Sequence, residues 1–192
     1  MKSMEEKIIR EGEVLPGNIL KVGNFLNQQI DTDFLKEIGS EIARLYKDSG
    51  VNKVFTIEAS GIAIAVAAAY ELGVPVVFAK KNRSDNISGG TYTTKVDSFT
   101  HKTTNVIVVS QEFIKAEDKI LIVDDFLANG NALLGLCNIV KQAGAEVVGA
   151  AIAIEKGFQR GGDALRETGM RVESLAIVDA MTEDGIVFRS QD

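Results

Sequence analysis

The amino-acid sequence predicts an α/β fold in which a mostly parallel, twisted sheet is flanked by helices. Short β-branched runs alternate with helical segments through most of the 192 residues, and repeated β–α–β order gives parallel strands with right-handed crossovers. The run at residues 119–123 (KILIV) is apolar throughout and is followed at once by charge, as expected for a central strand covered on both faces. A hydrophobic content of 45% suits one domain with a real core.

The individual elements follow from local patterns. Apolar residues at three-to-four spacing between Phe34 and Leu45 predict an amphipathic helix over residues 31–50. An Ala-rich segment that is apolar nearly all round predicts a buried helix over 61–72, which Gly73 ends. Further helices are expected at 131–143 and 163–168. Strands are expected at 53–57, 75–79, 105–110, 119–123, 146–154 and 172–178.

Two regions do not follow this alternation. Residues 1–30 contain a charged helix and then a stretch without clean periodicity, which indicates a small accessory unit. Residues 82–104 are rich in Ser, Thr, Asn and Gly and are long for a connection in a compact domain, so we expect a flexible lid loop there. The prediction is therefore a single domain over residues 1–192 with these two regions as additions.

Composition argues against several classes of protein. A formal net charge of -6 does not suit a nucleic-acid surface. The charged start, MKSMEEKIIREGE, lacks the apolar core of a signal peptide, and the longest apolar stretch, residues 62–70, is too short to cross a bilayer. A single cysteine permits no internal disulfide and fits a reducing compartment. We therefore expect a cytoplasmic protein without nucleic-acid or membrane partners.

The segment at residues 120–133, ILIVDDFLANGNAL, carries the most chemical information. A buried strand leads into Asp124 and Asp125, a short loop containing Gly130 follows, and a helix begins near Asn131. Ligands of parallel sheets bind at the carboxyl ends of strands, and the free N–H groups of a helix N-terminus suit a phosphate. The two carboxylates suit sugar hydroxyls or a Mg²⁺ ion on the same ligand, so the segment indicates a ribose 5-phosphate site. The alternative is a polar strand end with an ordinary helix cap.

ILIVDDFLANG resembles the 5-phosphoribosyl 1-diphosphate binding motif of the type I phosphoribosyltransferases. Other segments resemble the bacterial, xanthine-using branch of that family, in family order and over nearly the whole chain: LKVGNFLNQQID, TIEASGIA, GVPVVFAKK, VKQAGA, IEKGFQ and RVESLA. The resemblance implies the type I phosphoribosyltransferase fold. It also implies a purine-salvage enzyme that converts xanthine and 5-phosphoribosyl 1-diphosphate to xanthosine 5'-monophosphate and diphosphate.

Two other functions stay open at this point. One is a sister enzyme that prefers guanine, hypoxanthine or adenine. The other is a non-catalytic regulator that senses the diphosphate sugar. Such regulators usually carry a DNA-binding segment or a basic face, whereas this chain is acidic overall and has no room for a winged helix before residue 50. The resemblance further implies a homodimer and a Mg²⁺ cofactor that is bound mainly through the diphosphate substrate, without direct protein ligands.

The resemblance assigns roles around the diphosphate sugar. Asp124 and Asp125 correspond to the catalytic acids that serve the ribose hydroxyls. The loop that holds the 5-phosphate corresponds to Ala128, Asn129, Gly130, Asn131 and Ala132. The turn that contacts the diphosphate corresponds to Glu58, Ala59, Ser60 and Gly61. Lys80 and Lys81 would neutralise the diphosphate, within one subunit or across a dimer interface. Without the resemblance, an interpretation as solvated surface lysines is equally good.

The resemblance also assigns the base pocket, with the accessory unit, residues 1–30, as a hood over the purine. Lys156 would donate to the 6-oxo group, which suits an ammonium that can only donate. Asn27 would recognise the 2-position, and Leu20 would reach the base through its backbone. Hypoxanthine-guanine enzymes carry an Asp three residues after the second acid, where this chain has Ala128. No side-chain base for the purine nitrogen is therefore visible at that position.

Overall fold

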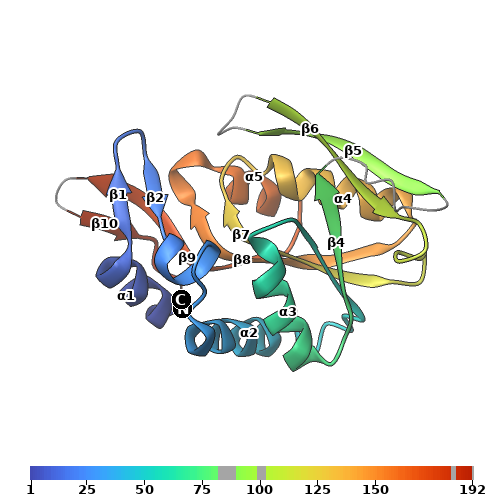
Figure 1. Ribbon diagram of the computed structural model, residues 1–192, viewed down its shortest axis with the longest axis horizontal. Coiled ribbons are helices and arrows are strands. Elements are labelled where there is room, and N and C mark those ends of the chain that lie inside the picture. The colour runs from blue at the N-terminus through green and yellow to red at the C-terminus, as the bar shows by residue number, and fades with distance from the viewer. Residues whose placement is uncertain (82–89, 99–102, 183–184, 192) are drawn as a thin grey trace.

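The computed structural model describes residues 1–81, 90–98, 103–182 and 185–191. In this part of the chain, a mixed sheet of eight strands runs in the order β10-β9-β8-β7-β3-β4-β6-β5 (Figure 1). The strands are β3 (Lys53–Ile57), β4 (Val76–Lys81), β5 (Thr91–Ser98), β6 (Thr103–Ser110), β7 (Lys119–Leu127), β8 (Glu146–Lys156), β9 (Val172–Thr182) and β10 (Gly185–Phe188). The five strands from β9 to β4 are parallel, while β10 pairs antiparallel with β9 at one edge and β6 pairs antiparallel with both β4 and β5 at the other.

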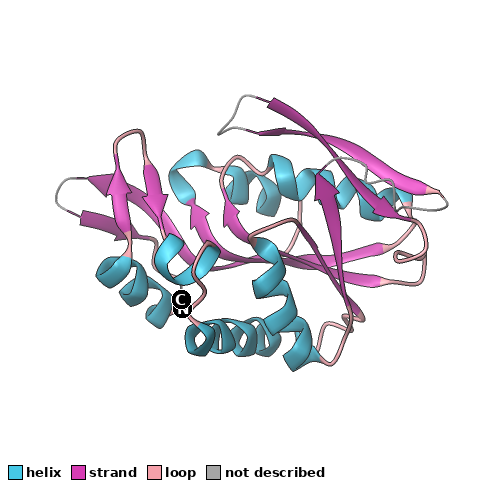
Figure 2. Ribbon diagram, in the orientation of Figure 1, coloured by secondary structure: helices cyan, strands magenta, loops and turns pink. Residues whose placement is uncertain are grey.

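Helices cover both faces of this sheet (Figures 1 and 2). On one face, α1 (Lys2–Glu11), α2 (Thr32–Tyr46) and α3 (Gly61–Leu72) contribute to a core with the inward side chains of β3, β7, β8 and β9. On the other face, α4 (Asn131–Gln142) and α5 (Gly161–Glu167) enclose a second core. The central strands β7 and β8 are buried along most of their length, as their continuous apolar sequences require. The predicted α/β class is therefore confirmed.

The accessory unit at the N-terminus has its own structure. After α1, strands β1 (Glu13–Leu15) and β2 (Ile19–Lys21) form an antiparallel hairpin, and a π-helix spans Gly23–Asn27. Phe25 and Leu26 of the π-helix are buried in the core that α2 and α3 share. This packing ties the unit to the domain and holds the end of the π-helix, at Asn27, at a fixed place.

Several elements differ from the sequence prediction. Residues 91–98, expected within the lid loop, form strand β5, which pairs with β6 along its whole length. Strand β9 runs on to Thr182, and β10 was not predicted. Helix α5 begins at Gly161, two residues early. Residues 82–89 and 99–102 of the predicted lid lie outside the described residues. Among the described residues, no helix has the length and apolar character needed to cross a membrane.

Candidate active site

A pocket of about 290 Å³ lies at the carboxyl ends of β3 and β7. Here β3 leads into α3 on one face of the sheet, and β7 leads into α4 on the other. The pairing between β3 and β7 ends at Phe55 and Ile122, whereas β7 stays paired with β8 as far as Leu127. The two strands therefore separate, which opens the crevice where parallel α/β sheets bind ligands. The lining includes Glu58, Ala59, Ser60, Lys81, and residues 124–133.

The two predicted acids lie on the wall of this crevice. Strand β7 continues through Asp124 and Asp125, instead of ending before them as the sequence suggested, because its pairing with β8 persists. Asp124 is only 7% exposed, and its Oδ1 accepts a hydrogen bond from the Asp125 backbone N–H at 2.9 Å. Burial, and secondly the adjacent Asp125 carboxylate, raises the pKa of Asp124 well above its usual range. A cationic or hydroxyl-bearing ligand at this wall would relieve that cost.

Residues 128–132, which we name the phosphate loop, join β7 to α4. Gly130 stands before the helix with φ 88°, a left-handed conformation that favours glycine. The Asn129 side-chain Oδ1 accepts from the Asn131 backbone N–H at 3.1 Å and fixes the turn. All five residues of the loop line the pocket, so the N-terminus of α4 faces it. Such an end presents backbone N–H groups and a positive dipole to an anion.

The turn between β3 and α3 forms the opposite wall. Glu58 Oε1 accepts from the Lys81 backbone N–H at 2.5 Å, which ties the turn to β4. A Cβ at Gly61 would come within 2.3 Å of Thr56 Oγ1 and 2.9 Å of Asp124 Oδ1. Only glycine fits here, and this close approach brings α3 against the acids. Sequence reasoning did not single out Thr56, whose buried hydroxyl has no hydrogen-bond partner among the described residues.

Only one of the two lysines predicted to contact the diphosphate lies in the pocket. Lys81 lines the pocket, and Lys80 does not. They are consecutive residues of β4, and consecutive side chains of a strand point to opposite faces. Within one subunit, Lys81 is therefore the residue that the fold brings to the crevice.

The residues predicted to bind the base connect the N-terminal accessory unit to strands β7 and β8. The Asn27 side-chain N–H donates to Asp125 Oδ2 at 3.2 Å, and the Lys156 ammonium donates to the Asn18 carbonyl at 3.2 Å. Sequence reasoning missed Phe126, whose ring centroid lies 5.8 Å from Lys156 Nζ, within range of a cation–π contact. Burial lowers the pKa of Lys156. Leu20 is 6% exposed and packs in the core, so only its backbone is suited to reach a base.

Comparison with known proteins gives this site its class. Residues 23–178 match the family described as Phosphoribosyl transferase domain, so the chain belongs to the phosphoribosyltransferase family. A xanthine phosphoribosyltransferase of Lachnoclostridium phytofermentans is 52% identical over 191 residues, covering 98% of each chain. One from Bacillus anthracis is 50% identical over 192 residues, covering 100% of this chain and 98% of its relative. These findings confirm the family that the sequence motifs suggested.

Solved structures agree on the fold. An adenine phosphoribosyltransferase from Trypanosoma brucei aligns with a TM-score of 0.77 at 17% identity, covering 98% of this chain and 85% of that one. The adenine phosphoribosyltransferase of Rhodothermus marinus gives a TM-score of 0.74 at 20% identity, covering 93% and 100%. The predicted type I phosphoribosyltransferase fold is confirmed. At these identities the likeness carries no statement about the base.

Proposed function

We propose that the protein is a purine-salvage enzyme that transfers the phosphoribosyl group of 5-phosphoribosyl 1-diphosphate to xanthine, giving xanthosine 5'-monophosphate and diphosphate. The observation that carries the proposal is the meeting of Asp124, Asp125 and the phosphate loop in one crevice beside the turn at residues 58–61. Relatives about 50% identical over the full chain bear the name xanthine phosphoribosyltransferase, which supports the choice of base.

The chemistry asks for positioning and electrostatics. As the bond from the anomeric carbon to the diphosphate breaks, positive charge develops on the ribose and negative charge on the leaving group. The N–H groups of the phosphate loop would hold the 5-phosphate, and Asp124 and Asp125 would hold the ribose hydroxyls and face the developing positive charge. Glu58–Gly61 and Lys81 would contact the diphosphate as it leaves. Fixing the sugar in this way turns the transfer into a reaction between held partners.

The base would bind between the hood and the sheet. Lys156 would donate to the purine 6-oxo group, and the Asn27 amide would donate to the 2-oxo group of xanthine. Both donors already have acceptors, the Asn18 carbonyl and Asp125 Oδ2, each at 3.2 Å. Binding of substrates would therefore exchange hydrogen bonds, so that neither donor is left unpaired at any stage.

Mg²⁺ is the expected cofactor, and the donor set fits a metal that arrives on its substrate. Among the described residues, no group of three or more His, Cys, Asp or Glu side chains is arranged to hold a metal ion. Asp124 and Asp125 would serve the ribose hydroxyls, which leaves the oxygen ligands of Mg²⁺ to the diphosphate and to water. When bound, Mg²⁺ would neutralise charge on the diphosphate.

We also propose a cytoplasmic homodimer. The single cysteine permits no internal disulfide, which suits a reducing compartment. Tyr70 is 84% exposed and Val66 52% exposed on α3, and Phe78 is 39% exposed on the following strand. Exposed apolar side chains of this size support contact with a second copy. Sedimentation of the wild-type protein and of Tyr70→Arg would test this, since the proposal expects a dimer that the arginine weakens; a wild-type monomer at micromolar concentration refutes it.

A panel of purine bases tests the function. The purified protein, Mg²⁺ and 5-phosphoribosyl 1-diphosphate would be combined with xanthine, guanine, hypoxanthine or adenine, and diphosphate release would be followed. We expect the highest kcat/KM with xanthine. A higher value with another base would identify a sister enzyme. Binding of the diphosphate sugar without turnover of any base would identify the regulator.

A further inference from the structure

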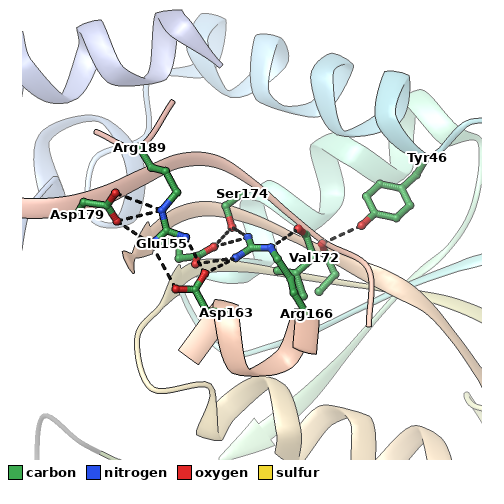
Figure 3. Close-up of polar contacts among 9 residues, drawn as sticks. Tyr46, Glu155, Asp163, Arg166, Val172, Ser174, Asp179 and Arg189 are labelled. Atoms are coloured by element: carbon green, nitrogen blue, oxygen red, sulfur yellow. Dashed lines mark hydrogen bonds and ion pairs between the residues drawn. The ribbon is translucent and has the colours of Figure 1, made fainter. Parts of the chain in front are cut away.

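A fully buried carboxylate stands next to the proposed base-binding lysine. Glu155, at the end of β8, has no exposed surface. Arg166 of α5 clamps it with two hydrogen bonds, Nη1 to Oε1 at 2.9 Å and Nη2 to Oε2 at 2.6 Å, and Ser174 of β9 donates to Oε2 at 2.5 Å (Figure 3). The proposed chemistry uses none of these three side chains.

A second arginine also contacts α5. Arg189, which follows β10, donates to Asp163 Oδ1 of α5 at 2.6 Å and to Asp179 Oδ1 of β9 at 2.8 Å (Figure 3). Arg166 Nη1 lies 3.5 Å from the same Asp163 oxygen, so one network of charges includes both arginines. Helix α5 has only seven residues and is held chiefly by these side chains and by Leu165 in the core.

This network touches the backbone on both sides of Lys156. Glu155 precedes the lysine directly. On the other side, a Cβ placed on Gly157 would lie 2.3 Å from Asp179 Oδ1 and 2.9 Å from Arg189 Nη2, so the chain there is pressed against the second arginine pair. The residues on both sides of Lys156 are therefore in contact with this charged network, while Lys156 itself pairs with Val178 of β9.

The same network reaches the phosphate loop through the first turn of α5. A Cβ on Gly161 would lie 2.3 Å from the Ala128 carbonyl oxygen and 2.7 Å from the Gly130 nitrogen. A Cβ on the next residue, Gly162, would lie 2.1 Å from Glu155 Oε1. The two glycines thus fill the space between the phosphate loop and the buried carboxylate, with no room for a side chain.

We propose that Glu155 and Arg166 are positioning residues that hold Lys156 and the phosphate loop at a fixed separation through the Gly161–Gly162 turn. The inference rests on the proposed function, because these two sites would bind the two reactants. The purine nitrogen must meet the anomeric carbon within a narrow distance, and a displacement of about 1 Å can cost about 100-fold in rate. A clamped ion pair supplies that rigidity better than apolar packing, because its fork geometry admits one arrangement.

The test compares two buried ion pairs. Glu155→Gln keeps the shape of the side chain and removes its charge. The matched control is Asp118→Asn, which breaks the pair with Lys53 (2.5 Å) at the opposite ends of the strands, where Asp118 is 7% exposed. We expect both variants to lower the unfolding temperature. Only Glu155→Gln should lower kcat/KM for xanthine, by about 100-fold, and weaken calorimetric binding of ribose 5-phosphate by about tenfold.

A double variant separates rigidity from stability. Glu155→Gln with Arg166→Gln removes both charges, so the unfolding temperature should recover toward wild type, while kcat/KM stays low because the fork is gone. Ser174→Ala, a milder change that removes one hydrogen bond to Glu155, serves if Glu155→Gln does not fold, and it should lower kcat/KM by a few-fold, on the order of one lost hydrogen bond.

Failure of the inference and failure of the function give different results. An active wild type in which Glu155→Gln matches Asp118→Asn in kcat/KM and in ribose 5-phosphate binding overturns the positioning role and leaves the function intact. A wild type that turns over no base but binds ribose 5-phosphate overturns the function. In that case, weaker binding by Glu155→Gln alone still supports the coupling of the network to the phosphate loop, and equal binding by the two variants refutes it.

Discussion

The substitution Asn27→Asp tests most directly whether Asn27 recognises the 2-position of the purine. In the structure, the Asn27 amide donates to Asp125 Oδ2 at 3.2 Å. The substitution converts this contact into two facing carboxylates. At an effective dielectric constant of about 20, two unit charges at this separation repel each other by about 5 kcal/mol, an upper bound because the hood can move or one carboxyl can take a proton. This loss falls on every base equally.

A second effect separates the bases. With xanthine, the Asn27→Asp variant would place an acceptor against the 2-oxo oxygen, whereas the 2-amino group of guanine could donate to it. An unpaired buried polar group costs about 1–3 kcal/mol, so the ratio of kcat/KM for xanthine over guanine should fall by about 10- to 100-fold. Asn27→Ala should lower the ratio less, because it removes the donor without adding an acceptor.

Initial rates with both bases at saturating 5-phosphoribosyl 1-diphosphate give this ratio. The matched control is Asn24→Asp on the same π-helix, where the exposed side chain donates to the Glu11 carbonyl at 2.9 Å, away from the crevice. It introduces the same charge change and should leave the ratio within about twofold, inside the range expected of a surface substitution. An unchanged ratio in Asn27→Asp would show that Asn27 does not read the 2-position.

Three further predictions concern the acids, the lid and the base lysine. Asp124→Asn with Asp125→Asn should reduce kcat by at least about 100-fold, the scale of lost transition-state charge stabilisation, with an unchanged circular dichroism spectrum; full activity in the folded variant would remove both acids from the site. Residues 82–90, the part of the predicted lid that precedes strand β5, should be cut by protease in the free protein and protected by product, and equal cleavage with and without product counts against a lid. Burial lowers the pKa of Lys156, so its ammonium loses a proton at a lower pH than that of an exposed lysine. As the pH rises, kcat/KM should therefore decline earlier in wild type than in Lys156→Arg, which stays charged. If the two pH profiles coincide on the alkaline side, the role of the ammonium is refuted.

The proposed phosphate half of the site could be recognised from the sequence because its residues are contiguous. Strand β7, the acids, the phosphate loop and the start of α4 follow one another within residues 119–133, so their order alone places them together. Strand β5 was not predicted, for a different reason. Strand β5 is largely polar and presents Val96 to the core, so its composition is close to that of a loop. Its partner supplies the hydrogen bonds that decide its structure.

The proposed base half of the site could not be derived from local patterns. Asn27 and Asp125 are 98 positions apart, and Lys156 and Asn18 are 138 apart. Periodicity within a window of 11–18 residues does not report such contacts. Only the family resemblance raised Asn27 from an ordinary asparagine, and Phe126 was missed because an aromatic residue after two acids has no local signature. The contacts themselves depend on how α1 and the π-helix pack against the sheet.

Two buried acids on neighbouring strands differ in whether a cation pairs with them. This difference separates a candidate ligand-binding residue from a residue of a structural ion pair. Asp124 and Glu155 both follow apolar runs, and the sequence marks them alike. Glu155 has its charge balanced by Arg166 and accepts a further hydrogen bond from Ser174, so its charge needs no ligand. Asp124 has no ion-pair partner in the described part of the chain; burial first, and then the neighbouring Asp125 carboxylate, raises its pKa, while Lys81 acts in the opposite direction. An uncompensated buried charge is costly, and it persists where a ligand supplies the missing partner. The proposed binding at Asp124 and the proposed positioning by Glu155 are therefore consequences of the same rule, applied to one acid without an ion-pair partner and to one with such a partner.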